Sequence, residues 1–194
     1  MKKNIFLWAG VFFLFSCSST PLMVQNPQEA SPYSVALLFQ KSNPPKLSAK
    51  EEQENLTEKE SSLSLFTLED EDVLKNALLN SFKNGNFFKD ARILNHQDEV
   101  SSSKAPYVVL ASYGGGLVIS QSGVNRSLTA KVLFELEFLK DQKVFKRAQI
   151  TTKQEGLWTE SSVKSEAIES AVKGALKLIL QEIEEKEQQE QKTQ

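Results

Sequence analysis

The strongest constraint on the fold is a clear alternation of apolar and polar side chains between residues 127 and 139, with Leu133 and Leu139 as the two apolar residues on the otherwise polar face. A period of two residues places successive side chains on opposite faces of a β-strand, so this stretch predicts a strand with one buried and one exposed face. The turn at residues 140–143 leads into a second strand over 144–152, which completes a predicted β-hairpin. The apolar face carries Leu128, Ala130, Val132, Phe134, Leu136 and Phe138, and the polar face carries Thr129, Lys131, Glu135 and Glu137.

Two other stretches have the periodicity of amphipathic helices. In residues 67–85, Thr67 and Asp70 have the spacing of a capping box, and Gly85 can end the helix. The second helix is expected to start at Ser161 or Ser162 and to continue to about residue 185. The apolar stripes consist of Leu74, Ala77, Leu78 and Phe82 in the first helix, and of Val163, Ala167, Ala171, Ala175 and Ile179 in the second.

Shorter strands are predicted over residues 33–39, 91–94 and 107–120, with a loop over 95–105. The polar stretch 40–64 is expected to be either a surface loop or a loop with a short, poorly packed helix. The expected fold class is α+β, with two layers: a small, mostly antiparallel sheet packed against two helices. We expect a single domain over residues 33–185, followed by a polar tail over 186–194 that is frayed over 188–194.

The N-terminal residues indicate where the protein resides. Lys2 and Lys3 precede an apolar stretch of eleven residues, 5–15, which is too short to cross a bilayer but typical of a secretory signal peptide. The sequence Leu14-Phe15-Ser16-Cys17 that follows resembles the bacterial lipobox. This resemblance implies a signal peptide over residues 1–16, thioether lipidation of Cys17 and a lipidated tether over 17–32. The alternative is an ordinary signal peptide or N-terminal anchor with an incidental cysteine.

Several acyl chains on Cys17 would hold the protein firmly on a membrane, since each buried methylene contributes about 0.8 kcal/mol. Ser18 follows this cysteine, whereas an Asp at that position tends to retain lipoproteins at the inner membrane of familiar two-membrane bacteria. The expected location is therefore the cell envelope, with the chain lipid-anchored to the outer membrane and facing the periplasm.

The composition argues against several classes of function. One cysteine excludes an internal disulfide framework, and one histidine makes a His-rich metal site or a Ser-His-Asp triad improbable. The net charge of -2 argues against a nucleic-acid-binding protein, which needs a dense basic surface. We therefore expect no catalytic residues, no metal, no cofactor and no nucleic-acid partner.

Three further motifs have simple structural interpretations. Gly114-Gly115-Gly116 lacks the Lys-Ser/Thr pair of a phosphate-binding loop, so a bulge or bend in a strand is expected there. His96 lies in a polar stretch and is expected to be a solvated loop residue. Glu135 and Glu137 could in principle act as paired catalytic carboxylates, but Lys131 shares their strand face, as is typical of a solvent-exposed side.

The predicted hairpin region, residues 126–153, carries seven basic residues and only three acidic ones. A positive patch on an otherwise negative chain can bind anions, for example lipid phosphates. The alternative is a solvated strand face and turn. The candidate anion-binding residues are Arg126, Lys131, Lys140, Lys143, Lys146 and Arg147, and Lys153 lies beyond them.

The stretch 107–183 resembles the lipopolysaccharide-assembly lipoprotein family. The similar features are a strand that ends in small residues, the segment 125–132 leading into Phe134-Glu135-Leu136-Glu137-Phe138, a hairpin and a long helix with Glu166-Ala167-Ile168. The resemblance implies a two-layer α+β fold that plugs a β-barrel partner in the outer membrane and contacts lipopolysaccharide. The order of elements, with residues 35–39, 85–87 and 107–110, also resembles activator lipoproteins of peptidoglycan synthases and curli-secretion lipoproteins.

Together these observations predict a non-catalytic, lipid-anchored envelope lipoprotein that acts as a binding or assembly module. Its partners would be membrane lipid through the acylated Cys17 and an envelope protein or glycolipid, such as a barrel protein or lipopolysaccharide. The alternative is an adaptor or activator lipoprotein that regulates a peptidoglycan-synthesis or secretion complex.

Overall fold

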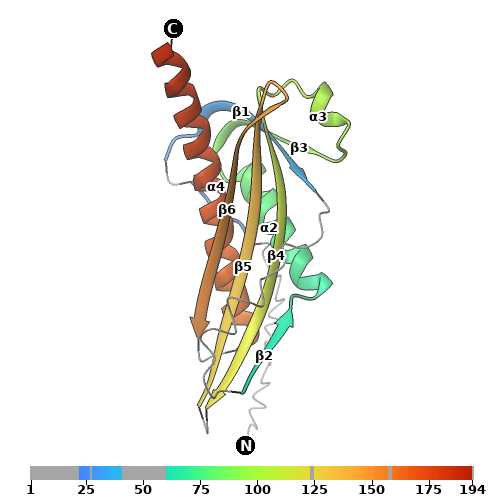
Figure 1. Ribbon diagram of the computed structural model, residues 1–194, viewed down its shortest axis with the longest axis vertical. Coiled ribbons are helices and arrows are strands. Elements are labelled where there is room, and N and C mark those ends of the chain that lie inside the picture. The colour runs from blue at the N-terminus through green and yellow to red at the C-terminus, as the bar shows by residue number, and fades with distance from the viewer. Residues whose placement is uncertain (1–21, 27, 41–59, 123–124, 157–158, 194) are drawn as a thin grey trace, which may run out of the picture.

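The computed structural model describes residues 22–26, 28–40, 60–122, 125–156 and 159–193. The predicted signal peptide and Cys17 lie outside these residues. Within them, the chain forms six strands and three helices (Figure 1). In chain order these are β1 (Ser31–Phe39), β2 (Glu60–Leu65), α2 (Leu68–Asn84), β3 (Phe88–Leu94), α3 (Glu99–Ser102), β4 (Tyr107–Ser122), β5 (Asn125–Lys140), β6 (Lys143–Gly156) and α4 (Glu160–Thr193).

The predicted α+β class is confirmed, but the sheet is larger than predicted and mixed. Its order is β3-β1-β4-β5-β6, with β2 also paired to β4. Strand β1 runs parallel to both β3 and β4, while the β2–β4, β4–β5 and β5–β6 pairs are antiparallel. A parallel partner requires a crossover connection, and α2 lies in the connection between β1 and β3.

Strand β2 lies inside the stretch that was expected to be a loop. Its backbone pairs with β4 from Glu60 opposite Gln121 to Leu65 opposite Gly116. The prediction was wrong for residues 60–64 because their alternation, Ser62-Leu63-Ser64-Leu65, is short and directly follows a long polar stretch. The rest of the predicted loop, residues 41–59, lies outside the described residues.

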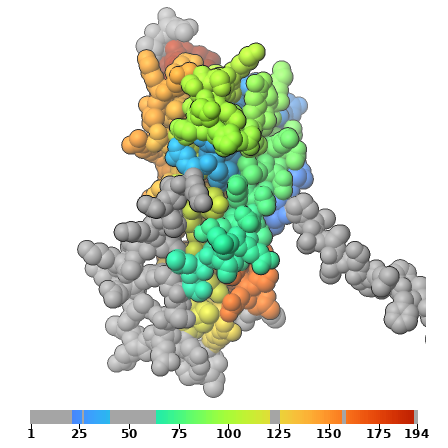
Figure 2. Space-filling view, turned by 90° about the vertical axis from the view of Figure 1, so that its right-hand side faces the viewer, coloured from blue at the N-terminus to red at the C-terminus, as the bar shows by residue number. Residues whose placement is uncertain are grey.

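One face of the sheet packs against α2 and α4, which lie behind it in Figure 1. The alternating apolar residues of β5 point into this core as predicted. The opposite face is partly covered by α3 and the segment around it, which Figure 2 shows beside the end of β1. The helices therefore do not form one simple layer. The cluster on that second face contains Ala36, Leu38, Val100, Ala105, Val108, Leu110 and Leu139.

The local signals predicted for α2 are confirmed. Thr67 and Asp70 form a reciprocal capping box, and Gly85 caps the C-terminal end. A Cβ atom at Gly85 would lie only 2.2 Å from the Ser81 carbonyl oxygen and 2.4 Å from the Val24 carbonyl oxygen. Glycine is therefore needed here because three backbone segments meet.

The predicted bulge at Gly114-Gly115-Gly116 was wrong, since β4 is uninterrupted and pairs with β5 in continuous register through all three residues. The structure gives another reason for Gly115. The ring of Phe66 lies directly over it, and a Cβ atom at this position would come within 2.3 Å of the ring. The glycine allows the segment between β2 and α2 to pack closely on β4.

Helix α4 is longer than predicted at its C-terminal end. It begins at Glu160, immediately after Thr159. The Oγ1 atom of Thr159 accepts a hydrogen bond from the Ser162 amide at 3.3 Å, so Thr159 replaces the expected serine cap. The helix continues to Thr193, so the end that was predicted to be frayed, residues 188–194, is helical as far as residue 193. No helix in the described part of the chain is long and apolar enough to cross a membrane.

The second half of the predicted tether packs against the domain. Val24 is buried, and its amide donates a 2.8 Å hydrogen bond to the Ser81 hydroxyl of α2. The Asn26 amide donates a 2.7 Å hydrogen bond to the Gly85 carbonyl. The expectation of a flexible tether therefore fails for residues 22–26.

Candidate functional site: a polar groove on the open sheet face

A groove of about 510 Å³ lies on the sheet face that α2 and α4 leave open. Strands β4, β5 and β6 form its floor. These are the long antiparallel strands at the front of Figure 1. The lining residues are Gln40, Leu110, Ser112, Glu135, Leu136, Glu137, Arg147, Ala148 and Gln149.

The strand register arranges the polar side chains of this groove in two rows. Ser112, Glu135 and Gln149 are directly opposite one another across the three strands and form the first row. Leu110, Glu137 and Arg147 form the second. Because side chains alternate along each strand, the same pattern that buries the apolar residues of β5 presents Glu135 and Glu137 on the groove side.

The two carboxylates have different surroundings. Glu137 accepts a 2.8 Å hydrogen bond from Nε of Arg147, so its charge is balanced within the groove. Glu135 is exposed, and in the described part of the chain it accepts one long hydrogen bond, at 3.4 Å from the Ser112 hydroxyl. No cation among the described residues pairs with Glu135. Among the described residues, the groove therefore carries one negative charge, on Glu135, that is not paired with a cation.

Gln40 follows the last residue of β1 and sits at the rim of the groove. Its amide N–H donates a 3.0 Å hydrogen bond to the Ala111 carbonyl of β4, which continues the parallel pairing by one residue. Its side-chain amide donates to Oε1 of Gln97 at 3.4 Å. The side-chain carbonyl oxygen of Gln40 remains able to accept a hydrogen bond.

The predicted anion-binding residues do not form one patch. Consecutive residues on β6 point to opposite faces, so Arg147 lies in the groove while Lys146 faces α4 and pairs with Glu182 at 3.4 Å. Arg126 pairs with Glu160 at 2.7 Å, at the opposite end of the hairpin from Lys140. Lys131 also has an interaction, whereas Lys143 and Lys153 form no ion pair within the described ranges.

Lys140 belongs to a compact cluster that ties the end of α4 to the sheet. Its ammonium group bonds to Glu187 at 2.9 Å and to Glu190, and Glu187 also accepts a hydrogen bond from the Tyr107 hydroxyl. Hydrogen bonds from Tyr107 and Lys140 lower the pKa of Glu187. Burial opposes the charge of Lys140, but hydrogen bonds with Glu190 and Glu187 outweigh it and raise the pKa of Lys140. Burial, followed by the bond to Glu187, raises the pKa of Tyr107.

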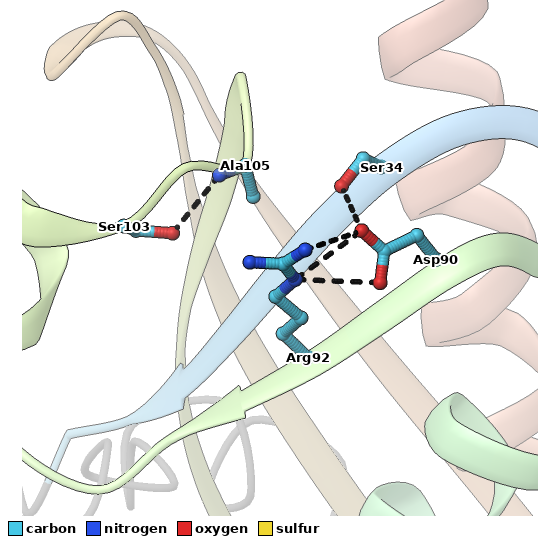
Figure 3. Close-up of polar contacts among 5 residues, drawn as sticks. All are labelled: Ser34, Asp90, Arg92, Ser103 and Ala105. Carbon is cyan, nitrogen blue, oxygen red and sulfur yellow. Dashed lines mark hydrogen bonds and ion pairs between the residues drawn. The ribbon is translucent and has the colours of Figure 1, made fainter.

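A second polar cluster joins β1 and β3 (Figure 3). Asp90 accepts a 2.8 Å hydrogen bond from the Ser34 hydroxyl and a forked contact from Arg92, with a closest distance of 2.9 Å. The hydrogen bonds from Arg92 and then from Ser34 lower the pKa of Asp90. Because Ser34 and Asp90 are directly paired across these strands, the cluster stabilises the strand register.

The other motifs acquire no chemical role in the described part of the chain. His96 is exposed in a turn before α3. No group of three or more His, Cys, Asp or Glu side chains in the described ranges is arranged to hold a metal ion. Sequence reasoning placed Glu135 and Glu137 on a solvent face but missed the groove, because the positions of Gln40 and Gln149 beside them depend on strand pairing.

Comparison with known proteins does not assign a family. No family model and no curated protein match the sequence. Among solved structures, protein XCC0632 of Xanthomonas campestris, from the DUF330 family, has 11% identity and a TM-score of 0.47, and the match covers 89% of this chain and 96% of that one. A neuraminyllactose-binding hemagglutinin homologue from Helicobacter pylori has 12% identity and a TM-score of 0.46, with 84% and 91% covered. A PelC dodecamer from Paraburkholderia phytofirmans has 17% identity and a TM-score of 0.35, with 75% and 90% covered. At these TM-scores and identities, the similarities carry no conclusion about function.

Proposed function

We propose that this chain is a non-catalytic, lipid-anchored lipoprotein of the cell envelope that binds a protein partner during outer-membrane assembly. The observation that carries the proposal is the polar groove on the sheet face that both long helices leave open. In this proposal, the sheet and the layer formed by α2 and α4 are a scaffold, and the opposite face receives the partner.

A protein partner fits the groove better than an anionic glycolipid does. Four of the six basic residues singled out from the sequence form ion pairs with acidic side chains of the same chain: Arg126, Lys140, Lys146 and Arg147. Their charge is therefore largely neutralised before any ligand arrives. The groove itself is slightly acidic, which disfavours phosphate.

A glycolipid remains the second candidate because of Lys143 and Lys153. Both are exposed on β6, and neither forms an ion pair in the part of the chain that the structure describes. Replacing both with Glu should weaken binding to vesicles that contain lipopolysaccharide if this candidate holds. Unchanged binding would remove the glycolipid from consideration.

The lipid anchor is tested by growing cells with labelled palmitate. The wild-type protein should carry label and partition into the detergent phase. The Cys17→Ser variant should carry none, whereas Thr151→Ser, a conservative change on the exposed face of β6, should label normally. Absence of label from the wild-type protein would contradict the anchor.

The binding face is tested with a photo-crosslinking amino acid placed at single positions in the membrane-bound protein. Thr151 is exposed on β6, two residues beyond Gln149, and Glu169 is exposed on α4. A probe at position 151 should give a specific protein adduct that the probe at 169 does not. Identification of the adduct distinguishes a barrel protein from a peptidoglycan-synthesis or secretion complex, and equal or absent adducts at both positions would contradict the proposed face.

A further inference from the structure

We propose that the groove binds the ammonium group of a lysine side chain presented by the partner protein. The inference rests on the proposed function, because it assumes that a protein docks on this face. It specifies the chemistry of the contact, with Glu135 as the residue that pairs with the incoming charge.

The first argument is the set of hydrogen-bond acceptors around Glu135. Its carboxylate lies between Ser112 and Gln149 in one row across three strands, where directly opposed residues have Cβ atoms about 5 Å apart. The hydroxyl oxygen of Ser112 and the side-chain carbonyl of Gln149 can both accept hydrogen bonds. An ammonium group has three N–H donors and no acceptor, so this row offers a complementary set of partners.

The second argument is charge. Arg147 already pairs with Glu137 in the adjacent row, at 2.8 Å. Within the described ranges, Glu135 has only the long contact with Ser112, and no ion pair with it is formed there. A cation placed beside Glu135 would form a charge-assisted hydrogen bond with its carboxylate, whereas an anion there would be repelled by it.

The third argument concerns the size of the occupant. The groove holds about 510 Å³, far more than an amine alone fills. Leu110 provides an apolar wall in the adjacent row, suited to the methylene stem of a lysine. A small free amine would bury too little surface in an open groove to bind firmly, so the ammonium group must be carried by a larger surface that covers the sheet face.

Zero-length coupling with a carbodiimide tests this contact directly, since it joins a carboxylate to a nearby amine. Full-length protein is treated in native membranes, and the adduct is digested and sequenced by mass spectrometry. The expected result is an amide bond between Glu135 and a lysine of the partner. Glu135→Gln should abolish this bond, while Glu169→Gln on the exposed face of α4 should leave it unchanged.

The photo-adduct from position 151 provides an independent measure of affinity. Glu135→Gln should lower its yield about tenfold or more, because a charge-assisted contact with the partner is lost, and added salt should lower the wild-type yield. A photo-adduct that forms normally in Glu135→Gln, without coupling at Glu135, would overturn the lysine proposal and leave the binding face intact. Absence of any photo-adduct in the wild-type protein would instead overturn the proposed function.

Discussion

At the scale of single residues, Gly115 should be the position in β4 most sensitive to added side-chain volume, because the ring of Phe66 packs directly on it. A Cβ atom at Gly115 would lie 2.3 Å from two carbons of the buried Phe66 ring. We predict that Gly115→Ala destabilises the protein by about 1–3 kcal/mol, because the ring must leave its packed position. Urea unfolding of the full-length protein measures the change.

Gly174 provides the matched control for this substitution. It lies within α4, and an added Cβ would meet the nearest atom, of Ile150, at an ordinary 3.6 Å. Gly174→Ala should therefore stabilise the protein by about 0.5–1 kcal/mol through helix propensity. Equal effects of the two substitutions would show that steric contact at Gly115 is not the cause.

Single residues also show which features could be predicted from the sequence and which could not. The alternation in β5 correctly separates buried Phe134 and Phe138 from Glu135. The same pattern cannot show that Lys146 pairs with Glu182, because this acidic residue lies on a helix 36 positions further along the chain. Excess charge in a sequence window therefore overstated the positive surface that the folded hairpin presents.

At the scale of elements, the cluster of Tyr107, Lys140, Glu187 and Glu190 should determine whether the end of α4 stays on the sheet. We predict that Lys140→Met destabilises the protein by about 1 kcal/mol, since it removes the partly buried ion pair with Glu187. Hydrogen exchange of the amides after residue 183 should become faster, while exchange in α2 should not change.

The same cluster predicts a pH dependence. Because the pKa values of Glu187 and Glu190 are lowered in the folded protein, their stabilising contribution is present at neutral pH. It should be lost as the pH falls below the ordinary carboxyl range, about 4.3, through the lowered folded values. Between pH 6 and pH 3, wild-type protein should thus lose more unfolding free energy than Lys140→Met, and parallel losses would contradict this coupling.

Predictability from sequence differed sharply between elements. Helix α2 was predicted to within one residue at each end, because its capping box and glycine cap are local signals. The end of α4 was missed, since the contacts that hold Glu187 and Glu190 come from Tyr107 and Lys140, distant in sequence. Strand β2 was missed for the same reason, because its pairing with β4 depends on backbone groups that every sequence carries.

At the scale of the whole molecule, the packed segment 22–26 limits how far the domain can lie from a lipid anchor. If Cys17 carries the acyl chains, only residues 18–21 separate it from this segment, which is fixed to the C-terminal end of α2 by Val24 and Asn26. At about 3.5 Å per residue, this connection cannot exceed roughly 18 Å. The end of the domain that contains Lys83 should therefore remain close to the membrane surface.

A fluorophore at exposed Lys83 should consequently be quenched by a spin label on lipid headgroups more strongly than one at exposed Ser127. Ser127 lies near the start of β5, at the opposite end of the long hairpin from the turn after Lys140. Inserting fifteen Gly and Ser residues after Thr20 should reduce the difference, because the longer connection releases the domain from the surface. Equal quenching at both positions before the insertion would mean that the packed segment 22–26 does not fix the orientation of the domain relative to the membrane. The anchor would then not orient the groove toward a partner.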